Sequence, residues 1–322
     1  MAPKRTFGVA DELSLVEKRL SECSRADIDT ISEIASYVVG SGGKRMRPII
    51  TLLSFRAVGG TDIGRAVDMA TAIELIHTGS LIHDDINDGG ELRRGRVSAL
   101  KRFGLEDSLV TGDFLFSKVF ELGSRFGSDI IMITADACSS LPAGEVLQRQ
   151  YRFNTSLKVD EYIAMTERKT ARLVSAGART GALIGNGTEE QVRRLGEYGR
   201  CVGITFQIVD DILDVNGSEE KLGKRIGADL REGNITLLSI YALNNGNKSM
   251  REELAGILQK RNKTDDEITR SIDLIREMGG PERAFKEAER YTNLAKENVS
   301  IFEGKYKDHL EELADYSLNR ER

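Results

Sequence analysis

The chain has 322 residues, of which 40% are hydrophobic and 30% charged, and its formal net charge is -5. This composition excludes a disordered or fibrous chain, and the negative net charge argues against an overall basic surface for nucleic acid. The three cysteines, Cys23, Cys138 and Cys201, form no CxxC pair, so neither a disulfide framework nor a structural zinc site is expected.

No targeting or membrane segment is apparent in the sequence. Basic residues occur within residues 1–8, but no apolar run follows them, as a signal peptide would require. No uninterrupted apolar stretch approaches the roughly 20 residues that a membrane-spanning helix needs. We therefore expect a cytoplasmic protein with no transmembrane segment and no nucleic-acid partner.

In chain order, the first strongly helical pattern leads into an acidic segment. Residues of one helical face recur from Ile73 to Leu81 and continue into His83-Asp84-Asp85. Gly89-Gly90 should end this helix just past Asp88.

Later segments carry equally clear helix signals. Gly185-Asn186-Gly187 should end one helix, and Thr188 with Gln191 predicts a capping box at the start of the next. Pro281 is a good first helical residue. One face of that helix is predicted to carry Ala284, Ala288, Tyr291, Ala295 and Val299.

No alternating, β-branched run bounded by turn signals predicts a strand. No Pro- or Ser-rich linker marks a domain boundary either, although a chain of this length could hold two domains. We predict an all-α protein with a single domain over residues 1–322.

Two acidic segments share the spacing DDxxD. They are Asp84-Asp85-Ile86-Asn87-Asp88 and Asp210-Asp211-Ile212-Leu213-Asp214. On a helix, residues four apart share a face, so each segment stacks like charges, which is unfavourable unless a cation compensates. A few hard oxygen ligands suit Mg²⁺, which binds substrate phosphate as well as carboxylate. A solvated acidic turn is the alternative for either segment alone.

Taken together, the motifs resemble those of the trans-isoprenyl diphosphate synthases, or polyprenyl synthetases, over most of the chain. The first acidic segment is followed by an arginine pair, as in that family, and the second is followed by Gly223-Lys224 and Gly227-Ala228-Asp229. Further matching segments are Gly42-Gly43-Lys44-Arg45-Met46-Arg47-Pro48, Glu74 with His77, Gly112-Asp113, Gly144-Glu145 with Gln148, and Lys169-Thr170. The resemblance implies a helical barrel of the isoprenoid synthase type with a central cavity.

The resemblance also implies the activity, which is head-to-tail condensation of isopentenyl diphosphate with an allylic diphosphate. Several Mg²⁺ ions bound by Asp84, Asp88, Asp210 and Asp214 would hold the allylic diphosphate. The catalytic set that it implies is Asp84, Asp85, Asp88, Asp210, Asp211, Lys169 and Lys224. A homodimer is expected on the same ground.

The resemblance assigns each substrate a group of side chains. Isopentenyl diphosphate would bind Lys44, Arg47, His77 and Arg94, where arginine suits a bidentate grip on phosphate. The allylic diphosphate would bind Arg93, Lys169, Thr170, Gln207 and Lys224. Taken alone, Lys44 and Arg47 could belong to a solvated basic loop, and His77 to an ordinary helix face.

Product length is expected to depend on the residues one turn before the first acidic segment. In the family these residues form part of the floor under the growing chain, and here they are the small Gly79 and Ser80. This favours an all-trans product of geranylgeranyl length or longer. The alternative is that Gly79 only permits close helix packing.

One departure from the family pattern concerns Asn234, which stands where a lysine that helps to hold the allylic diphosphate is usual. Arg231 is a candidate to compensate for it. Two other functions stay open: a class I terpene cyclase, which needs no isopentenyl diphosphate pocket, and a regulatory subunit of a hetero-oligomeric synthase, which typically lacks intact aspartates.

Overall fold

The computed structural model describes residues 5–217 and 226–320, and these residues are largely helical. The prediction of an all-α fold is confirmed. By its internal contacts the chain divides into two compact units. Unit 1 comprises Met1–Ser139, Leu173–Gly199 and Asn298–Leu313, and unit 2 comprises Ser140–Arg172, Arg200–Glu297 and Ala314–Arg322. That these units form one domain stays a prediction.

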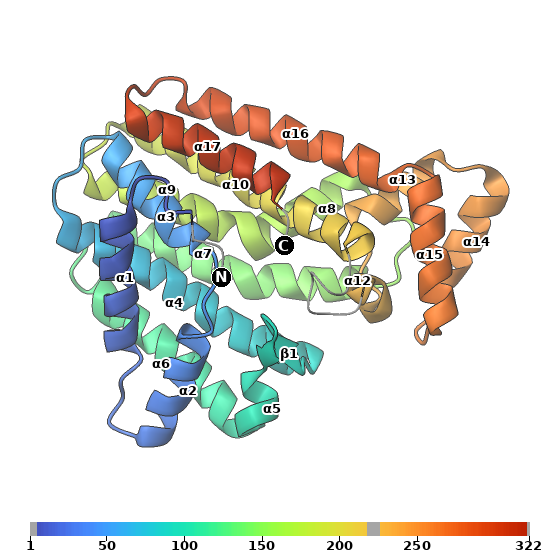
Figure 1. The fold of residues 1–322 in the computed structure, drawn as a ribbon, viewed down its shortest axis with the longest axis horizontal. Coiled ribbons are helices and arrows are strands. Elements are labelled where there is room, and N and C mark those ends of the chain that lie inside the picture. Colours follow the sequence, from blue (N-terminus) through green and yellow to red (C-terminus); the bar gives the residue numbers. More distant parts are fainter. Residues whose placement is uncertain (1–4, 218–225, 321–322) are drawn as a thin grey trace. The chain divides into compact units, whose positions relative to one another are not determined.

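Figure 1 labels the helices and strands, which belong to the two units as follows. Those within unit 1 are α1 (Ala10–Cys23), α2 (Asp29–Val39), α3 (Met46–Ala57), α4 (Ile63–Asp88), β1 (Leu92–Arg93), β2 (Arg96–Val97), α5 (Ala99–Phe103) and α6 (Leu105–Gly123). Those within unit 2 are α8 (Val159–Thr166), the π-helical turn η1 (Glu167–Ala171), α12 (Ala228–Glu232), α13 (Leu237–Asn245), α14 (Lys248–Leu258) and α15 (Asp265–Glu277). Residues of both units occur in α7 (Ser128–Tyr151), α9 (Arg172–Ile184), α10 (Glu189–Asn216), α16 (Gly280–Val299) and α17 (Lys305–Asn319).

The core of unit 1 forms around α4, which packs against α1, α3 and α6. The Asp62 side chain accepts a hydrogen bond from the Arg65 amide at the start of α4. The helix ends after Asp88 because Gly89 adopts a left-handed conformation, with φ of 64°. The predicted helix end is therefore confirmed, and it places the first acidic segment in the last turn of α4.

Local signals also set the bounds of α10 and the buried face of α16. The Thr188 amide donates to Gln191 Oε1 at 2.8 Å, and the Gln191 amide donates to Thr188 Oγ1 at 3.3 Å. This is the predicted capping box. The predicted core face of α16 is buried in full.

A short hairpin in unit 1 was not predicted from the sequence patterns. Strands β1 and β2 pair antiparallel, with Leu92 opposite Val97 and Arg93 opposite Arg96. The two residues between them, Arg94 and Gly95, both have positive φ, which is the geometry of a type I′ turn. Strands of two residues are too short to show an alternating pattern.

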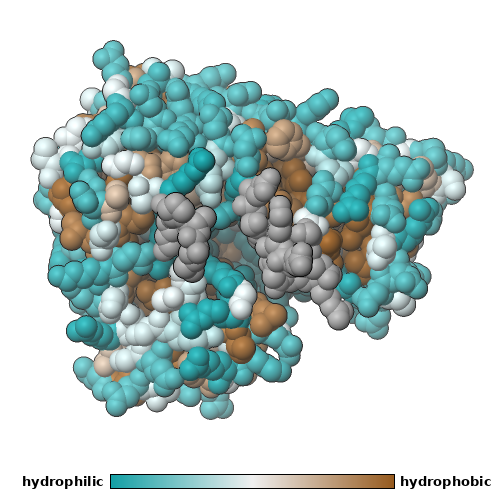
Figure 2. Space-filling model, in the orientation of Figure 1, coloured by the Kyte–Doolittle hydropathy of each residue, from teal (hydrophilic) through white to brown (hydrophobic). Residues whose placement is uncertain are grey.

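One helix of the described residues, α7, has the length and apolar composition of a membrane span, with a mean hydropathy of 1.3 over its most apolar window. A single helix of this kind is weak support for a membrane segment. Figure 2 shows a face that is mostly hydrophilic, with smaller hydrophobic areas.

Candidate active site

The first acidic segment occupies the C-terminal turn of α4, and its three aspartates differ in solvent exposure. Asp84 is half-buried and Asp88, four residues later on the same face, is exposed. Asp85 is only 4% exposed. The two residues predicted to bind metal therefore lie nearer to solvent than the aspartate between them.

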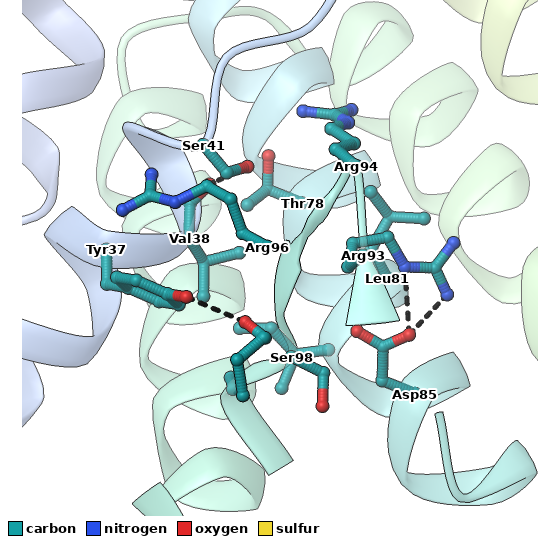
Figure 3. Close-up of a pocket in the computed structure, with 13 residues that line it drawn as sticks. Tyr37, Val38, Ser41, Thr78, Leu81, Asp85, Arg93, Arg94, Arg96 and Ser98 are labelled. Atoms are coloured by element: carbon teal, nitrogen blue, oxygen red, sulfur yellow. Dashed lines mark hydrogen bonds and ion pairs between the residues drawn. The ribbon is translucent and has the colours of Figure 1, made fainter. Parts of the chain in front are cut away.

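Asp85 is held by Arg93 from the hairpin. Its Oδ1 accepts a 2.8 Å hydrogen bond from Arg93 Nε and a second, shorter one from Arg93 Nη2. Burial raises the pKa of Asp85, and the Arg93 guanidinium acts in the opposite direction. The ion pair fixes where Arg93 points, which is towards the last turn of α4 (Figure 3).

The neighbouring Arg94 takes a different direction. Its Nη1 donates to the carbonyl of Gly42, in the loop that carries Lys44. In Figure 3, the side chains of Arg93 and Arg94 point in different directions from the hairpin, so the two adjacent arginines lie in different surroundings. That each arginine binds a different diphosphate stays a prediction.

A pocket in unit 1 separates the hairpin from α2 and α4, and it is lined by Thr78, Asp85 and the arginines of the hairpin, among others (Figure 3). Tyr37 closes one side, because its hydroxyl donates to the Val97 carbonyl at 2.7 Å. The Arg96 guanidinium lies over the Tyr37 ring, 4.5 Å from its centroid. These contacts anchor the hairpin that presents Arg93 and Arg94.

The cations of the basic loop, Arg45, Lys44 and Arg47, differ in how deeply they are buried. Arg45 is 4% exposed and binds Glu74 at 2.9 Å and Glu17 at 2.9 Å. Lys44 and Arg47 are each half-buried. Arg45 therefore stabilises the fold, and Lys44 and Arg47 are the basic side chains of this loop assigned to substrate.

His77 lies one turn above Leu81 on α4, among these cations. Burial lowers its pKa well below the usual value, and the positive charges of Arg47 and Arg94 lower the pKa further. The imidazole is therefore neutral at neutral pH and offers one N–H donor. A neutral donor suits a phosphate oxygen in a site whose positive charge comes from lysine and arginine.

The predicted floor residues sit where α4 meets α6. A Cβ atom added to Gly79 would lie 3.2 Å from the Phe116 ring and 3.4 Å from the Gly112 carbonyl. The Ser80 hydroxyl donates to the His77 carbonyl at 2.9 Å. Gly79 thus permits close packing of the two helices, and Phe116 is the aromatic side chain beside it.

In unit 2, the second acidic segment lies near the end of α10. Asp210 Oδ1 is 2.9 Å from Nη2 of Arg320. Asp214 is 2% exposed, and its Oδ2 accepts from the Asp229 amide at 3.1 Å. Asp214 therefore helps to hold the start of α12, and its role as a metal ligand stays a prediction.

The middle aspartate of this segment is buried, as in the first. Asp211 is 4% exposed and accepts hydrogen bonds from the Tyr162 hydroxyl at 2.6 Å and from Gln207 Nε2 at 2.9 Å. Burial, and then the charge of Asp229, raise its pKa well above the usual value. In both segments, the second aspartate is thus tied to protein groups.

Lys169 and Thr170 lie in the π-helical turn η1. Lys169 Nζ is 2.6 Å from Glu145 Oε2 and also donates to Gln148 Oε1. A Cβ atom at Gly144 would lie 2.4 Å from the Lys169 amide nitrogen, so glycine lets α7 approach this turn closely. The acidic and amide side chains of α7 thereby orient the Lys169 ammonium.

The two remaining positions that the sequence links to the allylic diphosphate are Lys224 and Asn234. Lys224 lies outside the described residues. Asn234 is 4% exposed; it donates to Asp229 at 3.2 Å and to Glu232 at 2.9 Å, and it accepts from Arg152 at 3.2 Å. Arg231, the candidate to compensate for a lysine there, binds Asp265 instead.

Sequence patterns missed two contacts of these predicted residues. Tyr162 and Arg320 touch aspartates of the second segment, but neither belongs to a recognisable motif. Each meets α10 from a distant part of the chain, so no local spacing could have found it.

Within residues 5–217 and 226–320, no three His, Cys, Asp or Glu side chains are grouped closely enough to hold a metal ion by themselves. Carboxylates in ones and twos fit Mg²⁺, which keeps waters and takes further oxygens from a substrate phosphate. The Arg320 guanidinium already forms an ion pair with Asp210.

The chain is similar to known proteins over most of its length. Residues 28–275 match the family model described as polyprenyl synthetase. The chain is 37% identical to a short chain isoprenyl diphosphate synthase of Methanothermobacter thermautotrophicus, over 95% of this chain and 96% of that protein. It is 33% identical to an octaprenyl diphosphate synthase of Haemophilus influenzae, over 96% of this chain and 94% of that protein.

Among solved structures, a polyprenyl synthase from Caulobacter crescentus, complexed with calcium and isoprenyl diphosphate, has a TM-score of 0.93. It is 32% identical, and the match covers 97% of this chain and 95% of the other. The fold is therefore that of the isoprenoid synthases, and this chain belongs to the polyprenyl synthetase family of prenyltransferases.

Proposed function

We propose that this protein adds isopentenyl diphosphate to an allylic diphosphate, head to tail, to make an all-trans product of geranylgeranyl length or longer. The observation that carries the substrate assignment is the divergence of Arg93 and Arg94. One arginine is paired with Asp85 beside the first aspartate segment, and the other is directed to the Lys44 loop. Two separately placed arginines suit two diphosphates.

In this proposal, isopentenyl diphosphate binds Lys44, Arg47, His77 and Arg94. Three side chains supply positive charge, and His77 donates a hydrogen bond without carrying charge. The allylic diphosphate binds Arg93, Lys169, Thr170, Gln207 and Lys224. The ordered contacts of Lys169 with Glu145 and Gln148 support its place in this set.

The reaction begins when the allylic carbon–oxygen bond breaks and its electron pair leaves with the diphosphate. Arg93 and Lys169 stabilise the negative charge that grows on the leaving group. The alkene of isopentenyl diphosphate forms the new carbon–carbon bond with the allylic cation. The adjacent carbon then loses a proton, which the released diphosphate accepts, so no protein base is assigned.

The aspartates proposed to bind Mg²⁺ are Asp84, Asp88, Asp210 and Asp214. When bound, Mg²⁺ would neutralise diphosphate charge and so assist its departure. The half-buried and exposed positions of Asp84 and Asp88, and the cation-accepting oxygen of Asp210, support this role.

A direct test is to incubate the purified protein with labelled isopentenyl diphosphate, an allylic primer and MgCl₂, and to size the products by chromatography. Elongated prenyl diphosphates are expected, and Asp84→Asn should abolish them. A cyclic hydrocarbon would indicate a terpene cyclase instead. Activity that appears only with a second protein would indicate a regulatory subunit.

We also propose a homodimer, whose interface lies on the exposed apolar side chains of unit 1. Phe120 of α6 is 77% exposed and Met132 of α7 is 67% exposed, with Val110 and Ile131 also outside the core. Exposed apolar side chains of this size are candidates for a contact surface with a partner subunit. Light scattering should give twice the mass of 35.6 kDa, and the protein should not float with lipid vesicles. Cytoplasmic location stays a prediction.

A further inference from the structure

A continuous chain of side-chain hydrogen bonds joins α8, η1 and α10. Tyr162 Oη donates to Asp211 Oδ2 at 2.6 Å, and Gln207 Nε2 donates to Asp211 Oδ1 at 2.9 Å. Thr170 Oγ1 donates to Gln207 Oε1 at 3.0 Å. All four side chains lie in unit 2. The chain thus connects a buried phenol to Thr170, the neighbour of Lys169.

These bonds leave little freedom to the groups they join. Asp211 accepts a donor on each carboxylate oxygen, so its rotation would leave a buried polar group unsatisfied. The Gln207 amide has one orientation, because its NH₂ group faces Asp211 and its oxygen faces Thr170. Gln207 and Asp211 are four residues apart and share a face of α10.

Tyr162 lies at one end of this series of hydrogen bonds. Its side chain is 1% exposed, and its ring belongs to the core of unit 2. Tyr162 precedes the π turn, which contains Lys169 and Thr170 and changes the register of the side chains within it and after it. A fixed contact before that turn therefore helps to set where Lys169 and Thr170 point.

We propose that Tyr162 is a positioning residue for prenyl transfer. Its hydroxyl holds Asp211 and, through Gln207, fixes Thr170 and the side chains of α10 that receive the metal-bound allylic diphosphate. Tyr162 touches neither substrate nor reacting atoms; it acts through Asp211. The assignment rests on the proposed function, because the groups that it positions are those given to the allylic diphosphate.

The chain supplies a matched control on the same helix as Asp211. Tyr198 of α10 is 0% exposed, and its hydroxyl donates to the Leu310 carbonyl at 2.7 Å. Tyr162→Phe and Tyr198→Phe each remove one buried hydroxyl and keep the ring. Only the first removes a contact to the second aspartate segment.

The experiment measures kcat, both substrate KM values, and the binding of inorganic diphosphate in MgCl₂ by calorimetry. Tyr162→Phe should lower kcat and the diphosphate affinity about 10- to 100-fold, the usual effect of removing a group that orients a ligand to metal. The KM for isopentenyl diphosphate should not change, because its proposed ligands lie in unit 1. Tyr198→Phe should match the wild type in all four quantities.

Wild-type kcat and diphosphate affinity in Tyr162→Phe would overturn the inference, and so would equal losses in the two variants. If the wild type makes no prenyl product, the proposed function fails, and the calorimetric comparison still decides the role of Tyr162. Thr170→Val gives a second check. If Tyr162 and Thr170 act through one hydrogen-bond network, the double variant Tyr162→Phe/Thr170→Val should lose less kcat than the product of the two single-variant losses. A loss of kcat equal to that product would contradict the network.

Discussion

The guanidinium of Arg320 lies 2.9 Å from Oδ1 of Asp210, and the Arg320 side chain is 2% exposed. The same side chain donates to the Phe206 carbonyl at 2.5 Å and lies over the Phe206 ring, 3.5 Å from its centroid. A residue near the end of the chain thus places a positive charge on the first aspartate of the second segment. A metal ion on this oxygen would have to replace that charge or share it.

We expect Arg320→Gln to lower the free energy of unfolding in EDTA by about 2 kcal/mol, because a charge-assisted hydrogen bond is lost. MgCl₂ should then stabilise the variant more than the wild type, since Asp210 no longer has a resident cation. Urea unfolding with and without MgCl₂ measures both effects. Arg290→Gln is the control: its pair with Glu287, in which the Arg290 side chain is 53% exposed, should contribute at most about 1 kcal/mol. If MgCl₂ raises the free energy of unfolding equally in the wild type and in Arg320→Gln, Arg320 and Mg²⁺ do not compete for Asp210.

The pair formed by Asp85 and Arg93 leads to a separate prediction. Asp85→Asn should raise the KM for the allylic diphosphate, because Arg93 loses the carboxylate that directs it. The KM for isopentenyl diphosphate should stay the same, since Arg94 keeps its contact with Gly42. The loss of a charged acceptor should also lower stability by about 1.5–3 kcal/mol.

Steady-state kinetics with each substrate varied in turn would measure this split. Glu91→Gln is the matched control, because it breaks an ion pair to Lys101 in which the Glu91 side chain is 71% exposed. It should change neither KM. A rise in both KM values for Asp85→Asn would indicate that the whole hairpin moves, and would refute a specific effect on Arg93.

The elements that the sequence predicted correctly are those set by neighbouring residues. Gly89 ends α4 and Thr188 starts α10 because each acts within one turn of its helix. The hairpin was missed since it depends on a positive φ at Arg94, a non-glycine residue for which no local pattern exists. Local chemistry thus predicts helix ends well and two-residue strands poorly.

The same distinction applies to the candidate site. The aspartates and basic residues were found by spacing, whereas Tyr162 was not, because its partner Asp211 is 49 positions away. Asn234 looked like a missing lysine, yet it bridges Asp229, Glu232 and Arg152. A motif names the groups that meet the substrate, and only the three-dimensional structure shows what holds them.

The lowered pKa of His77 predicts a change in stability at mildly acid pH. Above its ordinary pKa of 6.5, His77 is neutral in both folded and unfolded chains and contributes no pH dependence. As the pH falls below this value, the unfolded chain binds a proton that the folded chain does not. Stability is then lost, by up to about 1.4 kcal/mol per pH unit.

His77→Gln should therefore flatten the stability curve between about pH 6.5 and about pH 5, measured by urea unfolding. Glutamine keeps a neutral N–H donor, so prenyl transfer should weaken but persist. His309→Gln provides the control, since His309 lies 3.6 Å from a carboxylate oxygen of Glu312. A curve for His77→Gln as steep as that of the wild type would show that His77 takes up its proton while folded.

The contact between Gly79 and Phe116 refines the prediction of product length. Gly79→Phe should shorten the products if this position borders the growing chain, but its ring must first displace Phe116, because even a Cβ atom would lie 3.2 Å from that ring. Overpacking of this kind costs about 1–3 kcal/mol. Gly79→Phe combined with Phe116→Leu should recover stability and keep the shortened products. Gly256→Ala, on α14 where an added Cβ meets nothing within 4 Å, should leave the products unchanged and raise stability by up to about 1 kcal/mol, because alanine favours a helix more than glycine does. A bulky ring at the floor of the product cavity must stop the growing prenyl product earlier. If chromatography shows wild-type products from the stable double variant, Gly79 therefore serves helix packing alone.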